Sequence, residues 1–160
     1  MVVRLALLLG LAAALAACNP FAGFARTTPI PTASAMLHFT TIDLPRAGYC
    51  WNSGGQGECA DPAGIEDLLR TGYLKPYRTA GGLDVKVIFH SSSARTGFSV
   101  NLIQGPAEKG STVSETAPQT FRVDASPPAV AGTYIYVVTG SWPEGDVGFF
   151  LALDLIPGTA

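Results

Sequence analysis

Charged side chains are scarce in this sequence. Asp, Glu, Lys and Arg together make up 14% of the 160 residues, and there are only two histidines, His38 and His90. No run of basic residues occurs, whereas nucleic-acid binding needs a positively charged face. The same shortage argues against strong electrostatic attraction to anionic lipids. We therefore expect neither a nucleic-acid partner nor a polybasic membrane binder.

Catalytic motifs are missing as well. The sequence contains no G-x-S-x-G, H-E-x-x-H, S-x-x-K or P-loop pattern. His90 precedes Ser91, Ser92 and Ser93, but adjacent residues of a strand point to opposite faces, which makes a Ser–His pair there awkward. A small hydrolase is therefore the third hypothesis, and it requires a cleft in which a histidine meets Ser or Asp. We expect no catalytic residues and no cofactor.

No apolar run is long enough to span a membrane. The longest, Leu5 to Ala17, has 13 residues, whereas a membrane-spanning helix needs about 20. Arg4 precedes this run and small residues end it, an arrangement typical of a secretory signal peptide. The sequence therefore predicts export from the cytoplasm.

The end of that signal, Leu15-Ala16-Ala17-Cys18, resembles the lipobox of bacterial lipoproteins. The resemblance implies cleavage before Cys18 and lipid (palmitate or a similar acyl group) on this cysteine, so that the membrane is a partner through the lipid. Because lipid chains contribute about 0.8 kcal/mol per buried CH₂, two or three chains anchor a domain stably. Asn19 in place of Asp implies the outer membrane in a two-membrane host; in a one-membrane host the anchor is the outer leaflet. An ordinary signal peptide with an accidental cysteine is the alternative.

The predicted organisation is a signal peptide (residues 1–17), a flexible tether (residues 18–35) and one folded domain (residues 36–160). The tether contains Pro20, Pro29 and Pro31 and shows neither helical nor strand periodicity. Without Arg4, nine basic residues face twelve acidic ones, a formal charge of about −3.

Two cysteines, Cys50 and Cys59, remain once Cys18 carries lipid. An even pair in an exported chain predicts a disulfide, which stabilises a loop this short by roughly 2–3 kcal/mol. A redox pair is the first rival, but C-x-x-C is absent. A zinc site is the second, and beside carboxylates only the two histidines are available to complete it. We expect a structural disulfide and no metal.

Most of the domain has the period of β-strands. Apolar residues alternate with polar or smaller ones from residue 83 onward, in the segments 83–90, 98–102, 121–123, 134–138 and 149–155, with Gly/Pro turns between them. A first strand is expected over residues 36–44. Asp61-Pro62 is expected to open a short helix that Gly72 ends. The pattern predicts an all-β fold, an immunoglobulin-like antiparallel β-sandwich with one short helix.

Two resemblances accompany this fold. Gly132-Thr133-Tyr134-Ile135-Tyr136 resembles the entry to a late strand of immunoglobulin-like sandwiches. The series Tyr49-Cys50-Trp51, Cys59-Ala60-Asp61, Leu68-Leu69, Trp142 and Gly145-Asp146 looks like small uncharacterised bacterial lipoproteins, from about Tyr49 to Leu155. That resemblance supports the fold and the anchor but implies no reaction.

The leading hypothesis for function is a non-catalytic binding or structural module of the cell envelope, facing outside the cytoplasm, with an envelope protein or a small ligand as partner. Aromatic and acidic residues at predicted loops are the candidate contacts: Trp51, Asn52, Trp142, Glu144 and Asp146. Core packing is the competing role of the tryptophans, and turn hydrogen bonding that of Asp146. The second hypothesis is inhibition of an exported protease or hydrolase, with Asn52 and Ser53 presented by the disulfide loop.

Overall fold

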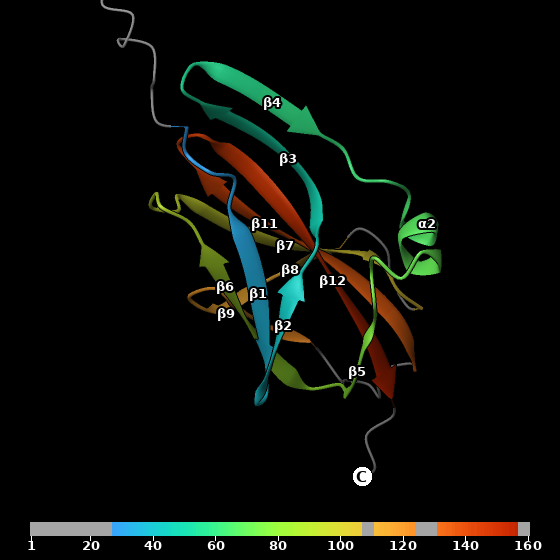
Figure 1. Cartoon of the computed structure of the whole chain (residues 1–160). Helices are drawn as coiled ribbons and strands as arrows, with labels where there is room; N and C mark the ends of the chain where they lie inside the picture. Colours follow the sequence, from blue (N-terminus) through green and yellow to red (C-terminus); the bar gives the residue numbers. More distant parts are fainter. Residues whose placement is uncertain (1–26, 107–110, 124–130, 157–160) are drawn as a thin grey trace, which may run out of the picture.

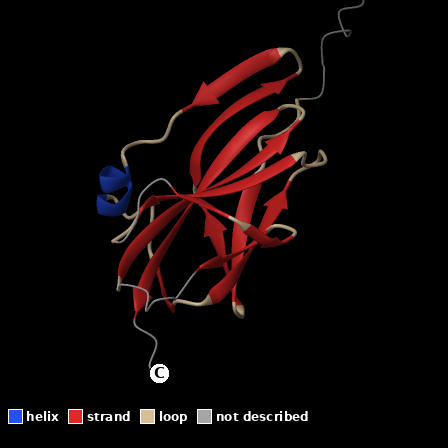
Figure 2. Cartoon of the chain, turned by 180° about the vertical axis from the view of Figure 1, so that it is seen from behind, coloured by secondary structure: helices blue, strands red, loops and turns tan. Residues whose placement is uncertain are grey.

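The computed structural model describes residues 27–106, 111–123 and 131–156. The predicted signal peptide, Cys18 and the first half of the predicted tether lie outside these residues. The described chain is all-β with one short helix, α2, and forms two sheets that face each other across a shared core (Figure 1). In the view from behind, the helix stands apart at one side of the strands (Figure 2).

The first sheet has five strands, in the order β2-β1-β6-β10-β9. They are β1 (Thr32–Leu37), β2 (Thr40–Leu44), β6 (Leu83–His90), β9 (Glu115–Ala117) and β10 (Thr120–Val123). All of its pairings are antiparallel. It begins with the hairpin formed by β1 and β2, and β6 returns to pair with β1.

The second sheet has seven strands, six of them in the order β4-β3-β12-β11-β7-β8, while β5 pairs with β12. They are β3 (Arg46–Ser53), β4 (Gln56–Ala60), β5 (Tyr77–Ala80), β7 (Gly97–Gln104), β8 (Ser111–Val113), β11 (Gly132–Trp142) and β12 (Gly145–Ile156). The pairing of β5 with β12 is parallel and the others are antiparallel.

The alternating pattern of the sequence separates two apolar clusters. On β11, Tyr134, Tyr136 and Val138 point into the core between the sheets, whereas Ile135 points to the opposite face. Successive side chains of a strand point to opposite faces, so one strand serves both sides. A strand with only one buried face would have alternated apolar with polar residues; this one is apolar on both.

The second cluster explains the position of α2 (Ile65–Arg70). Leu68 and Leu74 pack with Ile135, Phe150 and Ala152 on the outer face of the seven-stranded sheet. Gly72 has a φ of +72°, and the backbone N–H of Leu74 donates to the carbonyl of Leu68 at 3.0 Å, which ends the helix. No helix in the described residues is long and apolar enough to span a membrane.

The start of the helix differs from the expectation. Gly64, not Asp61, occupies the N-cap position, and no side chain caps the helix. The segment from Asp61 to Ala63 is instead an irregular connection from β4, with exposed residues. The pair Asp61-Pro62 predicted the start of a helix, and the helix begins later, at Ile65.

The first strand is also corrected. Strand β1 begins at Thr32, inside the predicted tether, and the expected strand over 36–44 is a hairpin that turns at His38 and Phe39. His38 has a φ of +52°, a left-handed conformation that non-glycine residues adopt infrequently. The sequence carries no Gly, Pro, Asn or Asp at this turn, so the usual turn signal was lacking.

The difference in burial between two phenylalanines predicts very different effects of replacing each with alanine. Phe121 is fully buried and packs on Tyr136, with 5.6 Å between ring centroids, whereas Phe39 is fully exposed. We expect Phe121→Ala to lower the free energy of unfolding by about 3–5 kcal/mol because it leaves a cavity. Phe39→Ala changes it by less than about 0.5 kcal/mol. Urea denaturation followed by circular dichroism measures both, and similar losses would contradict the two-sheet core.

Candidate binding site

A disulfide joins Cys50 and Cys59 across the hairpin of β3 and β4. Cys50 and Cys59 are directly opposite each other in the antiparallel register, with Cα atoms 4.1 Å apart. Both residues are exposed. The disulfide therefore joins neighbours that the hairpin already brings together.

The segment between the cysteines is a hairpin rather than a Gly-rich loop. The pairs Trp51–Glu58, Asn52–Gly57 and Ser53–Gln56 continue the register, which leaves only Gly54 and Gly55 as the turn. Their φ values are +63° and +81°. Positive φ at both central residues suits the right-handed twist of a two-residue hairpin, and glycine adopts it at little cost.

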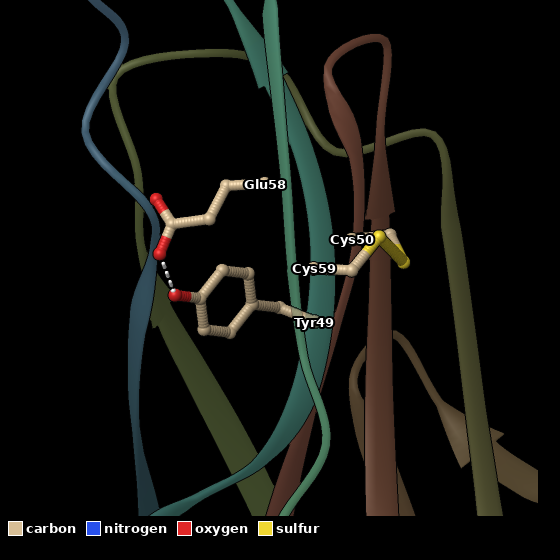
Figure 3. Close-up of a disulfide and its surroundings, with 4 residues drawn as sticks. All are labelled: Tyr49, Cys50, Glu58 and Cys59. Atoms are coloured by element: carbon tan, nitrogen blue, oxygen red, sulfur yellow. Dashed lines mark hydrogen bonds between the residues drawn. A yellow bond between two sulfur atoms is a disulfide. The ribbon is translucent and has the colours of Figure 1, made fainter.

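Tyr49 and Glu58 lie on the other side of this hairpin from the disulfide (Figure 3). The Tyr49 hydroxyl donates a hydrogen bond to Oε1 of Glu58. This hydrogen bond, together with desolvation and the negative charge of Glu58, raises the pKa of Tyr49. The Arg46 guanidinium stands 5.7 Å from the centre of the Tyr49 ring. The ring of Tyr49 is thus fixed both at its hydroxyl and at its face.

The two tryptophans belong to the core. Trp51 and Trp142 are each 4% exposed, and their rings meet edge to face with centroids 5.8 Å apart. Trp51 Nε1 donates to the carbonyl of Thr28 at 2.9 Å. Trp142 Nε1 is buried and has no hydrogen-bond partner within the described residues. Both rings are therefore unavailable to a ligand in this structure.

The three polar candidates are close in sequence to the two tryptophans, Asn52 on β3, Glu144 in the turn between β11 and β12, and Asp146 on β12. The backbone N–H of Asn52 donates to the carbonyl of Glu144 at 2.7 Å, and the Glu144 carboxylate accepts from Ser93 Oγ at 3.1 Å. Asp146 faces Cys50 in the register of β12 with β3. Asn52 and Asp146 are exposed and Glu144 is half-buried. The pairing of β3 with β12 thus brings the five sequence candidates into one region, but within the described residues none of them borders a cavity there.

A serine and a histidine do meet, although not the serines next to His90. Nε2 of His90 lies 3.3 Å from Oγ of Ser34 on the neighbouring strand β1. Ser34 is 3% exposed, and neither residue lines any of the cavities described next. The contact therefore provides no accessible nucleophile.

Three cavities lie around α2 and its flanking segments, away from the sequence candidates. The first, of about 260 Å³, is bordered by Arg46, Tyr49, Asp61, Pro62 and Tyr73. The second, of about 510 Å³, is bordered by Asp43, Tyr73, Lys75, Pro76 and Tyr77. The third, of about 500 Å³, is apolar and lies over the sheet beside the helix, bordered by Ala47, Ile65, Ile103, Val137 and Phe150.

Sequence reasoning recognised only part of this region. Tyr73 and Tyr77 are visible in the sequence as aromatics that flank Lys75-Pro76, but nothing in the sequence pairs them with Arg46 or Asp43 on other strands. Asp61 was assigned to the helix cap, a role that Gly64 takes. Within the described ranges, no group of three or more His, Cys, Asp or Glu side chains is placed to hold a metal ion.

Comparison with known protein families, with curated proteins and with solved structures finds no match to this chain.

Strand β12 lies very close to β3 at Gly145. Gly145 pairs with Trp51 and has a φ of +147°, and a Cβ there would lie 2.0 Å from the carbonyl oxygen of Cys50. We expect Gly145→Ala to lower the free energy of unfolding by about 2–4 kcal/mol, because backbone atoms must separate.

Gly57→Ala is the matched control, since a Cβ at Gly57 meets no atom within 4 Å. Its effect is expected to stay within about 0.5 kcal/mol. Both variants are compared by urea denaturation. Equal stability of the two would show that β3 and β12 do not approach as closely as described.

Proposed function

We propose that this chain is a lipid-anchored, non-catalytic binding module of the bacterial cell envelope, with its binding surface around α2. The observation that carries the proposal is the grouping of the three cavities around one helix and its flanking segments. Ligand sites are concave and combine apolar walls with a few polar groups. The five residues chosen from the sequence border none of these cavities, so the proposed surface shifts from the final hairpin to the side of α2.

The anchor is supported by the cysteines. Cys50 and Cys59 are bonded to each other, which leaves Cys18, at the end of the predicted signal, as the remaining cysteine of three. Disulfides persist in oxidising compartments outside the cytoplasm. Export, lipidation at Cys18 and an outward-facing domain are consistent with this pairing.

We also propose an immunoglobulin-like arrangement for the two sheets. It is supported by face-to-face antiparallel sheets and by a core tryptophan, Trp51, next to a cysteine in sequence. The disulfide differs from the pattern of antibody domains, because it lies within one hairpin rather than between sheets.

Inhibition of an exported protease is the second candidate. The hairpin of β3 and β4 supports it, since β4 is exposed over nearly its whole length and forms one edge of its sheet. Asn52 and the Gly54-Gly55 turn are exposed on the same hairpin, which the disulfide holds closed. A constrained, protruding hairpin binds a cleft with little loss of conformational entropy.

Acyl labelling tests the anchor. With the full chain expressed in a bacterial host and supplied with labelled palmitate, we expect label on the wild-type protein and none on Cys18→Ser. The double variant Cys50→Ala, Cys59→Ala is the control, because it removes the other cysteines and is expected to keep the label. Label that survives Cys18→Ser would refute the lipid anchor, as would an unlabelled wild-type protein.

Substitutions at two exposed residues, Asn52 and Tyr73, distinguish the two candidate functions. The chain from residue 19 onward retains every described element and serves as bait for envelope fractions. Recovery of the same partner by wild type and Asn52→Ala, with loss in Tyr73→Ala, is expected for binding around α2. Dose-dependent inhibition of exported proteases that Asn52→Ala abolishes and Tyr73→Ala leaves intact would instead establish the inhibitor.

A further inference from the structure

We infer that the first two cavities form one oligosaccharide-binding groove centred on Tyr73. Tyr73 borders both, and is the residue that they share. We call them together the tyrosine groove, with Arg46, Tyr49 and Asp61 on one side of Tyr73 and Asp43, Lys75 and Tyr77 on the other. This inference rests on the proposed function, since it names the ligand class of the same surface.

The groove repeats one combination of side chains. Each half holds two tyrosines, counting Tyr73 in both, one basic residue and one acidic residue. A repeated set of recognition groups matches a ligand that repeats along its own length. A linear glycan, whose sugar rings recur at a regular interval, is such a ligand.

The tyrosines provide the stacking surfaces. Tyr73 is 57% exposed, unlike the two buried tryptophans, while Tyr49 and Tyr77 are half-buried. An aromatic ring offers a large apolar face together with a polar edge, and the C–H face of a pyranose ring packs on such a surface. Tyr49 is held in place by Glu58 and Arg46, so its ring does not have to be ordered when a ligand binds.

The charged residues of the groove retain hydrogen-bonding capacity. Within the described part of the chain, Asp43, Asp61 and Lys75 form no hydrogen bond or ion pair with other side chains, whereas Asp67 pairs with Arg70 on the nearby helix. Arg46 donates one hydrogen bond, from Nη2 to the carbonyl of Ile30 at 3.3 Å. Its guanidinium has five N–H donors in all.

This set of groups favours a neutral polyol over an ion. Each half of the groove contains both signs of charge, and the acidic residues and Lys75 are exposed to water, where salt screens ionic attraction. Sugar hydroxyls both donate and accept, so a carboxylate and a cationic donor on either side of a ring satisfy them together. The third cavity lacks such groups among its apolar borders.

Saturation-transfer NMR on the chain from residue 19 tests the inference. The probes are glucose, mannose and N-acetylglucosamine, each as the monosaccharide and as its linear β-linked tetramer. We expect saturation of ring protons for at least one series, with the tetramer binding about tenfold more tightly than its monomer because both halves of the groove are used. Absence of saturation transfer from all six probes would overturn the inference.

Substitutions locate the binding. Tyr73→Ala is expected to weaken tetramer binding about tenfold or more, while Tyr73→Phe keeps the ring and retains most of the affinity. Asp61→Asn and Asp43→Asn each weaken it less. Phe39→Ala and Asp84→Asn, which alter an exposed ring and an exposed carboxylate on the five-stranded sheet, are matched controls expected to bind as wild type. Unchanged binding in Tyr73→Ala would also overturn the inference.

The two proposals fail separately. If Cys18 is acylated and an envelope protein is recovered through Tyr73 but no saccharide binds, the glycan assignment is wrong and the anchored binding module stands. If a tetrasaccharide binds through Tyr73 but Cys18 carries no label, the groove stands and the lipid anchor is wrong.

Discussion

Strand β12 is the element on which the rest of the structure depends. It pairs with β11 along its whole length, with β3 at its beginning and with β5 at its end. Phe149 on one face fills the core between the sheets, and Phe150 on the other supports α2. Because successive residues of a strand point to opposite faces, this one segment positions the two sheets, the helix and the cavities beside the helix.

The same alternation explains what the sequence could predict. The segments 83–90, 134–138 and 149–155 are long and periodic, and each lies within an observed strand, β6, β11 and β12. Strands β8 and β9 have three residues each and β4 is almost wholly exposed, so none of them carries a hydrophobic period. Each pairs with the strand next to it in the chain, β4 with β3, β8 with β7 and β9 with β10, but strands this short or this exposed show no apolar alternation from which to predict the pairing.

For the candidate site residues, too, the sequence predicted what is local and missed what depends on contacts between distant segments. Sequence reasoning identified the cysteine pair, because an even number of cysteines after a predicted signal peptide suffices to predict a disulfide. From the sequence, Trp51 and Trp142 are candidate binding residues at predicted loops. Their burial results from the pairing of β3 with β12, two strands that are far apart in the sequence. Tyr73 is visible in the sequence as an aromatic near Lys75, but its position between two cavities, one of them bordered by Arg46, follows only from the fold.

The distance in sequence between β3 and β12 also concerns how the chain assembles. During synthesis, which proceeds from the N-terminus, β3 is made long before β12. One edge of β3 therefore stays unpaired until β12 has been made. Contacts between such distant segments form slowly, and unpaired edges invite wrong association in the meantime. The other edge of β3 is occupied at once by β4, across a two-residue turn that needs no distant residue. The Cys50–Cys59 bond therefore protects an early, local structure, and the last strand to arrive completes the domain.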